Sequence, residues 1–311
     1  MSQDANRVYK KHSVDWWIYT VPFLIIVSVL SYLIVHSRPG GIRGVMIFYL
    51  APLVVAVLAM VFFIGGIITS IIRRPFFTPL RIAAFIALVL LCFSGSIYNK
   101  YPSSYDDKPS KVVFRLPLDT ATTVAWGGGN ENVNYHVVAP DQCWAYDLLV
   151  IKDGKSFSGD STKLENYHCY GLPVLAPAAG KVIKAYDADR DMPVGVLGGG
   201  KEPVGNHIII EVAPKEFLFI CHLQPKSIRV KVGDMVQQGQ QLALVGNSGN
   251  TSEPHIHMHL QDTDEQGIGE GIPFYFYRYS VGGRVVERGI PTGGIDDSGK
   301  PIGQTVQHVR Q

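Results

Sequence analysis

Three histidines alternate along one short segment, at His255, His257 and His259. Successive side chains of a β-strand point to opposite faces, so a strand here would place all three imidazoles on one face. The Asn-Ser-Gly-Asn run at 247–250 is a turn signal and favours a strand after it. Three imidazoles on one face are costly to bury without a metal or a proton partner, and neutral imidazole is a common zinc ligand. The spacing therefore predicts metal or catalytic chemistry.

Short apolar runs bounded by Gly, Pro, Asn and Asp surround these histidines in the second half of the chain. No long amphipathic helical period competes with them, so residues 126–285 are expected to form an all-β domain. We expect 101–125 to be an extended linker, and 286–311, rich in Gly, Asp and Ser, to be a flexible tail. The runs that predict strands are 174–176, 181–185, 207–212, 217–222 and 241–245.

The first hundred residues have a different texture. Residues 16–35, 44–72 and 82–99 are runs of 20, 29 and 18 residues without a charge. About 20 apolar residues cross a bilayer as a helix, so residues 1–100 predict a membrane region with three transmembrane helices, at about 16–36, 44–72 and 80–99. The lipid bilayer is therefore an expected partner.

The distribution of basic residues predicts the orientation of these helices. Cytoplasmic tails and short loops are enriched in Lys and Arg, which places the N-terminus in the cytoplasm and, after three crossings, residues beyond 100 on the far side. The net charge of the chain is only +2, with no concentrated basic face, so nucleic acid is not expected as a partner. The basic residues on the predicted cytoplasmic side are Arg7, Lys10, Lys11, Arg73, Arg74 and Arg81, against Arg38 and Arg43 in the opposite loop.

A series of motifs in the all-β region resembles the LytM and lysostaphin-type zinc endopeptidases. The most specific is Pro-His-Ile-His at 254–257, preceded by Gly-Asn-Ser-Gly-Asn-Thr at 246–251. The resemblance covers roughly residues 134–279, less than half of the chain. Earlier motifs in the same order are Pro-Val-Leu-Ala-Pro at 173–177, Gly-Asn-His-Ile-Ile-Ile at 205–210, Phe-Ile-Cys-His-Leu at 219–223, Val-Gly-Asp at 232–234 and Gly-Gln at 239–240.

The resemblance implies roles for three histidines of these motifs. In the family, the second histidine of His-x-His binds zinc, which implies His257 as a metal ligand. The first assists catalysis as an acid/base or oxyanion-stabilising group, which implies His255. The histidine of the preceding strand is the second catalytic one, which implies His222.

The family supplies its other two zinc ligands from an upstream histidine and aspartate, usually four residues apart. The resemblance implies Asp147 as the aspartate and His136 as the histidine, although these positions are 11 residues apart. Some members of the family resemble this sequence in having an insertion after an Asn-x-His segment. His168, in a second Asn-Tyr-His triplet, is the competing candidate.

The fold implied by the resemblance is a barrel-sandwich, or duplicated hybrid motif, peptidase domain. The implied activity is that of a zinc metalloendopeptidase, with one Zn²⁺ per chain, that hydrolyses peptide bonds in peptidoglycan cross-links. Together with the three helices it implies a multi-pass protein of the bacterial inner membrane with a periplasmic peptidase domain. The alternative is a non-catalytic LytM-like module that binds cell wall or regulates a partner hydrolase. A third interpretation, a lipoyl-type carrier, lacks the presented lysine, because Gln237 and Gln238 occupy the hairpin tip.

Two further histidines and three cysteines have side chains that could take part in chemistry. His259 is expected to be a hydrogen-bonded or exposed strand histidine, with a supporting position behind the metal ligands as the alternative, and His207, which opens a strand, is expected to be structural. Strand alternation predicts that Cys221 lies on the face opposite to His222, in the core. Outside the cytoplasm, Cys143 and Cys169 could form a disulfide.

Overall fold

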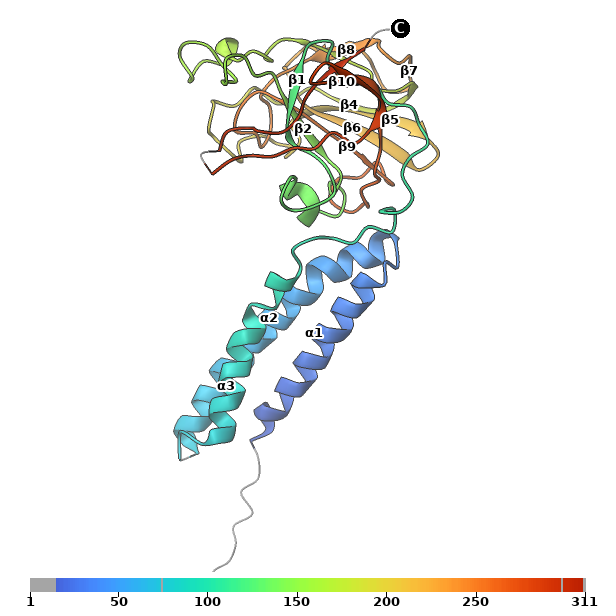
Figure 1. Cartoon of the computed structure of the whole chain (residues 1–311). Helices are drawn as coiled ribbons and strands as arrows, with labels where there is room; N and C mark the ends of the chain where they lie inside the picture. The colour runs from blue at the N-terminus through green and yellow to red at the C-terminus, as the bar shows by residue number, and fades with distance from the viewer. Residues whose placement is uncertain (1–14, 74, 298, 310–311) are drawn as a thin grey trace, which may run out of the picture. The chain divides into compact units, whose positions relative to one another are not determined.

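The structure, a computed structural model, describes residues 15–73, 75–297 and 299–309. Its contacts divide the chain into two compact units: Met1–Ser37 with Met46–Tyr98, and Arg38–Val45 with Asn99–Gln311 (Figure 1). The basic residues Arg7, Lys10, Lys11 and Arg74, on which the predicted orientation depends, lie outside the described residues. The first unit is helical and the second is built from β-strands, as the change in sequence texture predicts.

Three α-helices, α1 to α3, form the described part of the helical unit and pack around an apolar centre. Trp17, Leu24 and Leu88 are completely buried there. Apolar side chains such as Phe23 and Leu53 are about 60% exposed on the outside, which is the surface that contact with lipid requires. The elements are η1 Trp16–Tyr19, α1 Thr20–His36, α2 Gly41–Ile72, α3 Pro79–Cys92 and η2 Ser94–Ile97.

Two of these helical segments are long and apolar enough to cross a membrane. They are Trp16–His36 and Gly41–Ile72, with mean hydropathies of 2.4 and 2.8. The third differs from its prediction at 80–99, because α3 ends at Cys92 and is about 21 Å long at 1.5 Å per residue, short of a hydrocarbon core of about 30 Å. Ser94, Gly95 and Ser96 follow; they are weaker helix formers than the preceding Leu and Ala, and the chain continues as a 3-10 turn.

The second unit contains a ten-stranded antiparallel sheet and a separate two-stranded sheet. The order in the large sheet is β11-β10-β12-β1-β2-β9-β6-β5-β4-β7, and β3 pairs with β8 in the small one. Five of the strands confirm the five predicted apolar runs: β3 Pro173–Leu175, β4 Gly180–Tyr186, β5 Asn206–Ala213, β6 Glu216–Leu223 and β8 Gln241–Leu244. The others are β1 Thr122–Trp126, β2 Tyr146–Leu149, β7 Met235–Val236, β9 Ile256–Gln261, β10 Phe276–Val281, β11 Arg284–Gly289 and β12 Thr305–His308, with 3-10 turns η3 Tyr135–Val138 and η4 Leu164–Asn166.

The core of the β unit lies on one face of the large sheet, and β9 shows how the sequence divides its side chains. Ile256, Met258 and Leu260 belong to the main core cluster, which also contains Val174 of β3 and Leu242 of β8. The intervening His257, His259 and Gln261 lie on the opposite face. The strand predicted from the period-two pattern is therefore confirmed as β9. It places His257 and His259 on the face away from the main core.

Both ends of the β domain differ from their predictions. The segment expected to be a linker contributes Phe114, Leu116 and Leu118 to the core, each at most 1% exposed. The segment expected to be a flexible tail contains β12, which lies between β10 and β1 and buries Val306. The alternation of Phe114, Leu116 and Leu118 is a usable period-two signal that the sequence-based expectation missed, whereas Val306 acquires its partners only when distant strands are brought together.

Candidate metal centre

Asp147 is the centre of a group of buried donor atoms in the middle of the large sheet. In the register of β2 with β9, Asp147 stands directly opposite His257. The His257 Nδ1 atom lies 2.8 Å from Asp147 Oδ1, and the His136 Nε2 atom lies 3.6 Å from Asp147 Oδ2. One donor atom from each of His136, Asp147 and His257 lies within 4.8 Å of the other two. Two imidazole nitrogens and a carboxylate in this arrangement fit a zinc ion and leave its fourth position open.

His136 reaches this group from outside the sheet. It lies on the 3-10 turn η3, and the side chain of Asn134 caps that turn by accepting a hydrogen bond from the His136 backbone N–H. The eleven-residue separation from Asp147 is accommodated because the chain loops out between β1 and β2 and returns to the sheet at Tyr146. His168, the competing candidate, contacts Ser158 at 3.3 Å and is not part of the group. The geometry therefore favours His136 as the upstream histidine.

His222 and His255 lie beside the three donors. Their ring centroids are 4.9 Å apart, and His255 Nε2 lies 3.5 Å from Asp147 Oδ1. His222 Nδ1 is 2.7 Å from the carbonyl oxygen of Ser248, and His255 Nδ1 is 2.8 Å from that of Glu253. A carbonyl only accepts, so both Nδ1 atoms carry a hydrogen and donate it. Each Nε2 atom is then left for the chemistry of the site.

A bulge in β6 brings His222 to the site face. The register between β5 and β6 shifts by one residue between Asn206↔Leu223 and Ile208↔Ile220, and His222 has a φ of 60°. Such bulges re-aim side chains and are frequent near active sites. The prediction that Cys221 and His222 lie on opposite faces is therefore wrong, because Cys221 pairs with His257 across β9 and shares its face. Cys221 is nevertheless buried, as expected.

The turn that carries Ser248 depends on a close approach of two backbones. Gly249 has a φ of 84°, and a Cβ at that position would lie 2.3 Å from the backbone nitrogen of Gly205. Only glycine fits such a position. The Ser248 hydroxyl accepts from the Asn206 backbone N–H and donates to the Leu223 carbonyl, which fixes the turn against β5 and β6. The glycine-rich motif before the His-x-His thus orients His222.

The charges of the group fit a cation. Burial by itself would raise the pKa of Asp147, but the neighbouring imidazoles of His136, His255 and His257 outweigh burial and hold this pKa well below its usual range. Burial lowers the pKa of His136 to about 4, and burial together with the charge of His255 lowers the pKa of His222 well below its usual value. For His255, burial lowers the pKa, but the Asp147 charge outweighs it and the net shift is upward. A carboxylate and neutral imidazoles are the forms that bind metal.

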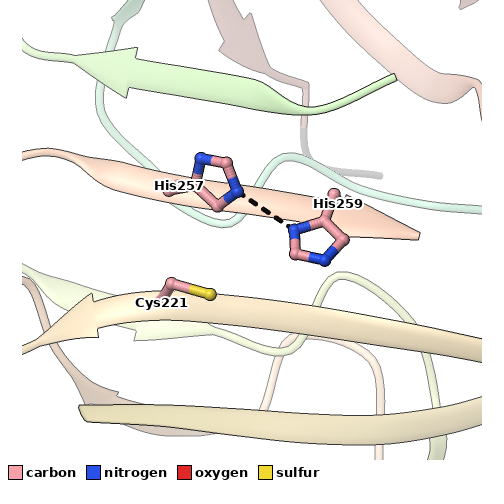
Figure 2. A group of neighbouring side chains, drawn as sticks. All are labelled: Cys221, His257 and His259. Carbon is pink, nitrogen blue, oxygen red and sulfur yellow. Dashed lines mark hydrogen bonds between the residues drawn. The ribbon is translucent and has the colours of Figure 1, made fainter. Parts of the chain in front are cut away.

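A second group of three donors shares His257 with the first (Figure 2). It consists of Cys221, His257 and His259, and its donor atoms also lie within 4.8 Å of one another. The His257 Nε2 and His259 Nδ1 atoms, which would face an ion there, are hydrogen-bonded to each other at 3.0 Å. Burial raises the pKa of the Cys221 thiol well above its usual value, so it remains a protonated and poor ligand. The first group fits a metal better.

A cleft of about 540 Å³ opens over the site. Trp126, Tyr135 and Leu197 line its walls, and His136, His222, His255 and His257 line it with Asp147. The sequence analysis did not single out Trp126 or Tyr135, although the position of Tyr135 next to His136 is a usable signal. It also missed Gln261, which continues the same two-residue period. Such a cleft can hold an extended peptide over the donors.

The two cysteines considered for a disulfide are free thiols in the structure. The Cys143 thiol donates to the carbonyl of Gly271 and the Cys169 thiol to the carbonyl of Pro254, at 3.8 and 2.9 Å. Pro254, whose carbonyl accepts the hydrogen bond from Cys169, immediately precedes His255 in the sequence. A neighbouring contact, from the Ser156 hydroxyl to the Glu253 carboxylate at 2.5 Å, joins the same inserted segment to the start of the His-x-His motif.

Comparison with known proteins identifies the domain. Residues 165–268 match the sequence model of Peptidase family M23. A curated relative, the peptidoglycan DD-endopeptidase ShyB of Vibrio cholerae, is 32% identical over 95 residues, which cover 27% of this chain and 22% of ShyB; the chain thus spans about a fifth of that relative. The catalytic domain of lysostaphin from Staphylococcus simulans is 18% identical, with 48% and 86% of the two chains covered and a TM-score of 0.30. A zinc-containing peptidase from Vibrio cholerae is 23% identical, and the match covers 48% of this chain and 36% of that peptidase with a TM-score of 0.32.

The β unit therefore carries a metallopeptidase-type domain, and the chain contains a domain of peptidase family M23, the lysostaphin/LytM type. This confirms the resemblance noted in the sequence. The matched residues include His222, His255 and His257 but begin only after His136 and Asp147. The assignment of those two rests on the geometry around Asp147.

Proposed function

We propose that this protein is a membrane-anchored zinc metalloendopeptidase that hydrolyses peptide bonds in peptidoglycan cross-links. The observation that carries the proposal is the convergence of His136, Asp147 and His257 on one point, beneath a cleft that His222 and His255 also line. The donor set is of the kind found in catalytic zinc sites, which use three protein ligands and keep one position open.

Zinc, when bound, supplies a Lewis acid that activates a water molecule and polarises the scissile carbonyl. Two neutral imidazoles and one carboxylate leave that ion a net positive charge. His222 and His255 act beside it through their Nε2 atoms, because their Nδ1–H groups are already donated to backbone carbonyls. These two histidines share the transfer of the water proton and the stabilisation of the oxyanion and leaving amine.

The substrate class follows from the family relative and the cleft. ShyB is named as a peptidoglycan DD-endopeptidase, and we carry peptide cross-links over to this chain as the proposed substrate. The helical unit, with two segments long enough to span a bilayer, anchors the chain and confines its activity to wall close to the membrane. The proposed location is the bacterial inner membrane, with the N-terminus in the cytoplasm and the β unit outside.

Metal content and product release together test the enzymatic proposal. The full chain, purified in detergent, is expected to carry about one zinc and to release soluble muropeptides from purified sacculi, and chelation is expected to stop the release. His257→Ala should lose both zinc and activity. His168→Ala is the matched control, because His168 is a histidine of the same domain that is not in the donor group. Full activity of the metal-free chain would contradict the proposal.

The same experiment separates the enzyme from a non-catalytic module. A chain that binds zinc and sacculi but releases no muropeptides from any peptidoglycan type would favour wall binding or regulation of a partner hydrolase. The orientation is a separate matter: three crossings place the β unit opposite to the N-terminus, whereas two place both on one side. Reporter fusions to residue 311, read for cytoplasmic or periplasmic activity, are expected to give the periplasmic result.

A further inference from the structure

The two histidines of the proposed donor set each have a second ring nitrogen, and each of these nitrogens is held by a buried partner. For His136 the partner is Asn134, which is completely buried. The Asn134 Nδ2 group donates to the carbonyl oxygens of Gly128 and Ala145, at 2.8 and 3.1 Å. Two acceptors at that end identify it as the nitrogen end, so Oδ1 must face His136.

This orientation determines where the proton of His136 lies. Asn134 Oδ1 is 2.8 Å from His136 Nδ1. Because a carboxamide oxygen only accepts, Nδ1 carries the hydrogen and Nε2 keeps its lone pair. That lone pair belongs to the nitrogen that lies 3.6 Å from Asp147 Oδ2.

A longer series of hydrogen bonds, which begins at Gln261 and passes through His259, ends at His257. The Gln261 Nε2 group donates to the carbonyl oxygens of Thr263 and Glu265, at 2.7 and 2.9 Å, so its Oε1 faces His259 Nε2 at 3.2 Å. His259 Nε2 must then be the donor and its Nδ1 the acceptor. His257 Nε2, 3.0 Å away, donates to it (Figure 2). In the neutral form of His257, Nδ1 is then left with the lone pair, and this atom lies 2.8 Å from Asp147 Oδ1.

The surroundings of His259 keep the direction of these hydrogen bonds fixed. It is completely buried, and its ring is stacked on Phe219 with centroids 4.6 Å apart and planes 17° apart. Burial opposes a second proton on the ring, and the stacking holds the plane of the ring. Each link between Gln261 and His257 therefore has one favourable direction.

From these contacts we infer that two buried carboxamides, Asn134 directly and Gln261 through His259, fix the protons of His136 and His257 so that both ligand lone pairs face Asp147 before any metal arrives. His259 and Gln261 are then positioning residues of the metal site. The inference rests on the proposed function, since it concerns how the chain prepares for zinc. Two lone pairs and a carboxylate directed at one point repel one another, and a cation relieves this repulsion.

The proton positions can be read without metal. In the metal-free full chain in detergent, selectively ¹⁵N-labelled at histidine, long-range ¹H–¹⁵N spectra should show the hydrogen on Nδ1 of His136 and on Nε2 of His257 and His259. Gln261→Met removes the terminal acceptor at nearly constant size, and it should give His257 and His259 mixed tautomers while His136 is unchanged. A hydrogen on Nδ1 of His257 in the metal-free wild type would overturn the inference.

Zinc affinity gives the second readout. His259→Leu removes the acceptor of His257 and should weaken zinc binding about 10- to 100-fold, the usual range for partners of ligand histidines. His259→Gln can still accept from His257 and donate to Gln261, so it should restore affinity to within about threefold of wild type. His207→Leu is the matched control: His207 is also buried, bonded to a carbonyl and stacked on an aromatic ring, Tyr186, but its ring hydrogen bond goes to Gly205 and not to a residue of the donor group.

The outcomes separate this inference from the proposed function. A wild-type chain that binds no zinc would overturn the proposed function. Zinc binding by wild type with an unchanged affinity in both His259→Leu and Gln261→Met would overturn the inference alone. Equal loss of affinity in His207→Leu and His259→Leu would also overturn it, because the effect would then come from the loss of any buried histidine.

Discussion

Lowering the pH of the metal-free protein should destabilise the β unit through His136 in particular. Burial lowers the pKa of His136 to about 4, against 6.5 in an unfolded chain. Between these values the unfolded chain binds a proton at this position and the folded protein does not. Stability contributed by this group is therefore complete above about pH 6.5 and is lost as the pH falls towards about 4.

The size of the effect follows from the shift. A difference of about 2.5 units, at 1.36 kcal/mol per unit, corresponds to about 3 kcal/mol of unfolding free energy across this window, with a slope of at most about 1.4 kcal/mol per pH unit. His222 contributes with the same sign, because burial and the neighbouring His255 charge lower its pKa as well. A variant is therefore needed to isolate the part that belongs to His136.

His136→Gln provides that comparison, because it removes one titrating group and leaves His222 and Asp147 in place. We expect the unfolding free energy of wild type to fall between pH 6.5 and 4 by about 3 kcal/mol more than that of the variant. The assay is urea unfolding of the chelated full chain in detergent, followed by ¹⁹F NMR of 5-fluorotryptophan. Trp126 and Trp144 report on the β unit, whereas Trp16 and Trp17 belong to the helical unit. Equal pH slopes in the two proteins would refute the reasoning.

Three further outcomes are expected from the structure. Chelation of zinc should lower the unfolding free energy of the β unit by about 2.7 kcal/mol relative to the protein at a free zinc concentration of 100 Kd, and His257→Ala should be insensitive to it. Val306→Ala truncates a completely buried side chain of β12 and should lower the unfolding free energy, measured with urea, by about 2 kcal/mol. Val285→Ala, on the exposed side of β11, should leave the unfolding free energy almost unchanged. Equal losses in the two variants would mean that β12 is not packed as described. At His222, which has a φ of 60°, Gly should give a more stable protein than Ala by about 1 kcal/mol, the reverse of the order in a regular strand, and an Ala variant as stable as the Gly variant would contradict the bulge.

Local spacing along the chain was enough to predict several features of this protein. The alternation of His255, His257 and His259 placed two of them on β9 and the third just before it, because the pleat fixes which side chains share a face. The apolar runs of the first hundred residues predicted three helices in the same way, since their length and lack of charge are local properties. The five predicted strands were found for the same reason.

Other features were decided by contacts between distant segments. Sequence spacing could not choose between His136 and His168, because the choice depends on which loop folds back over Asp147. Nor could it find the bulge at His222, where one extra residue in β6 cancels the alternation that holds elsewhere along the strand. The entry of β12 between β10 and β1 is of the same kind, since its pairing is with strands far away in the chain.

The physical reason for this division is the range of the interactions involved. A strand's period and a helix's length follow from backbone geometry, which every residue carries with it. The position of a donor atom to within an ångström depends on loop closure, register shifts and hydrogen bonds such as those of Asn134 and Gln261, whose partners are chosen only when the sheet has assembled. The sequence therefore specified which chemistry the chain could perform, and the tertiary structure decided which atoms meet to perform it.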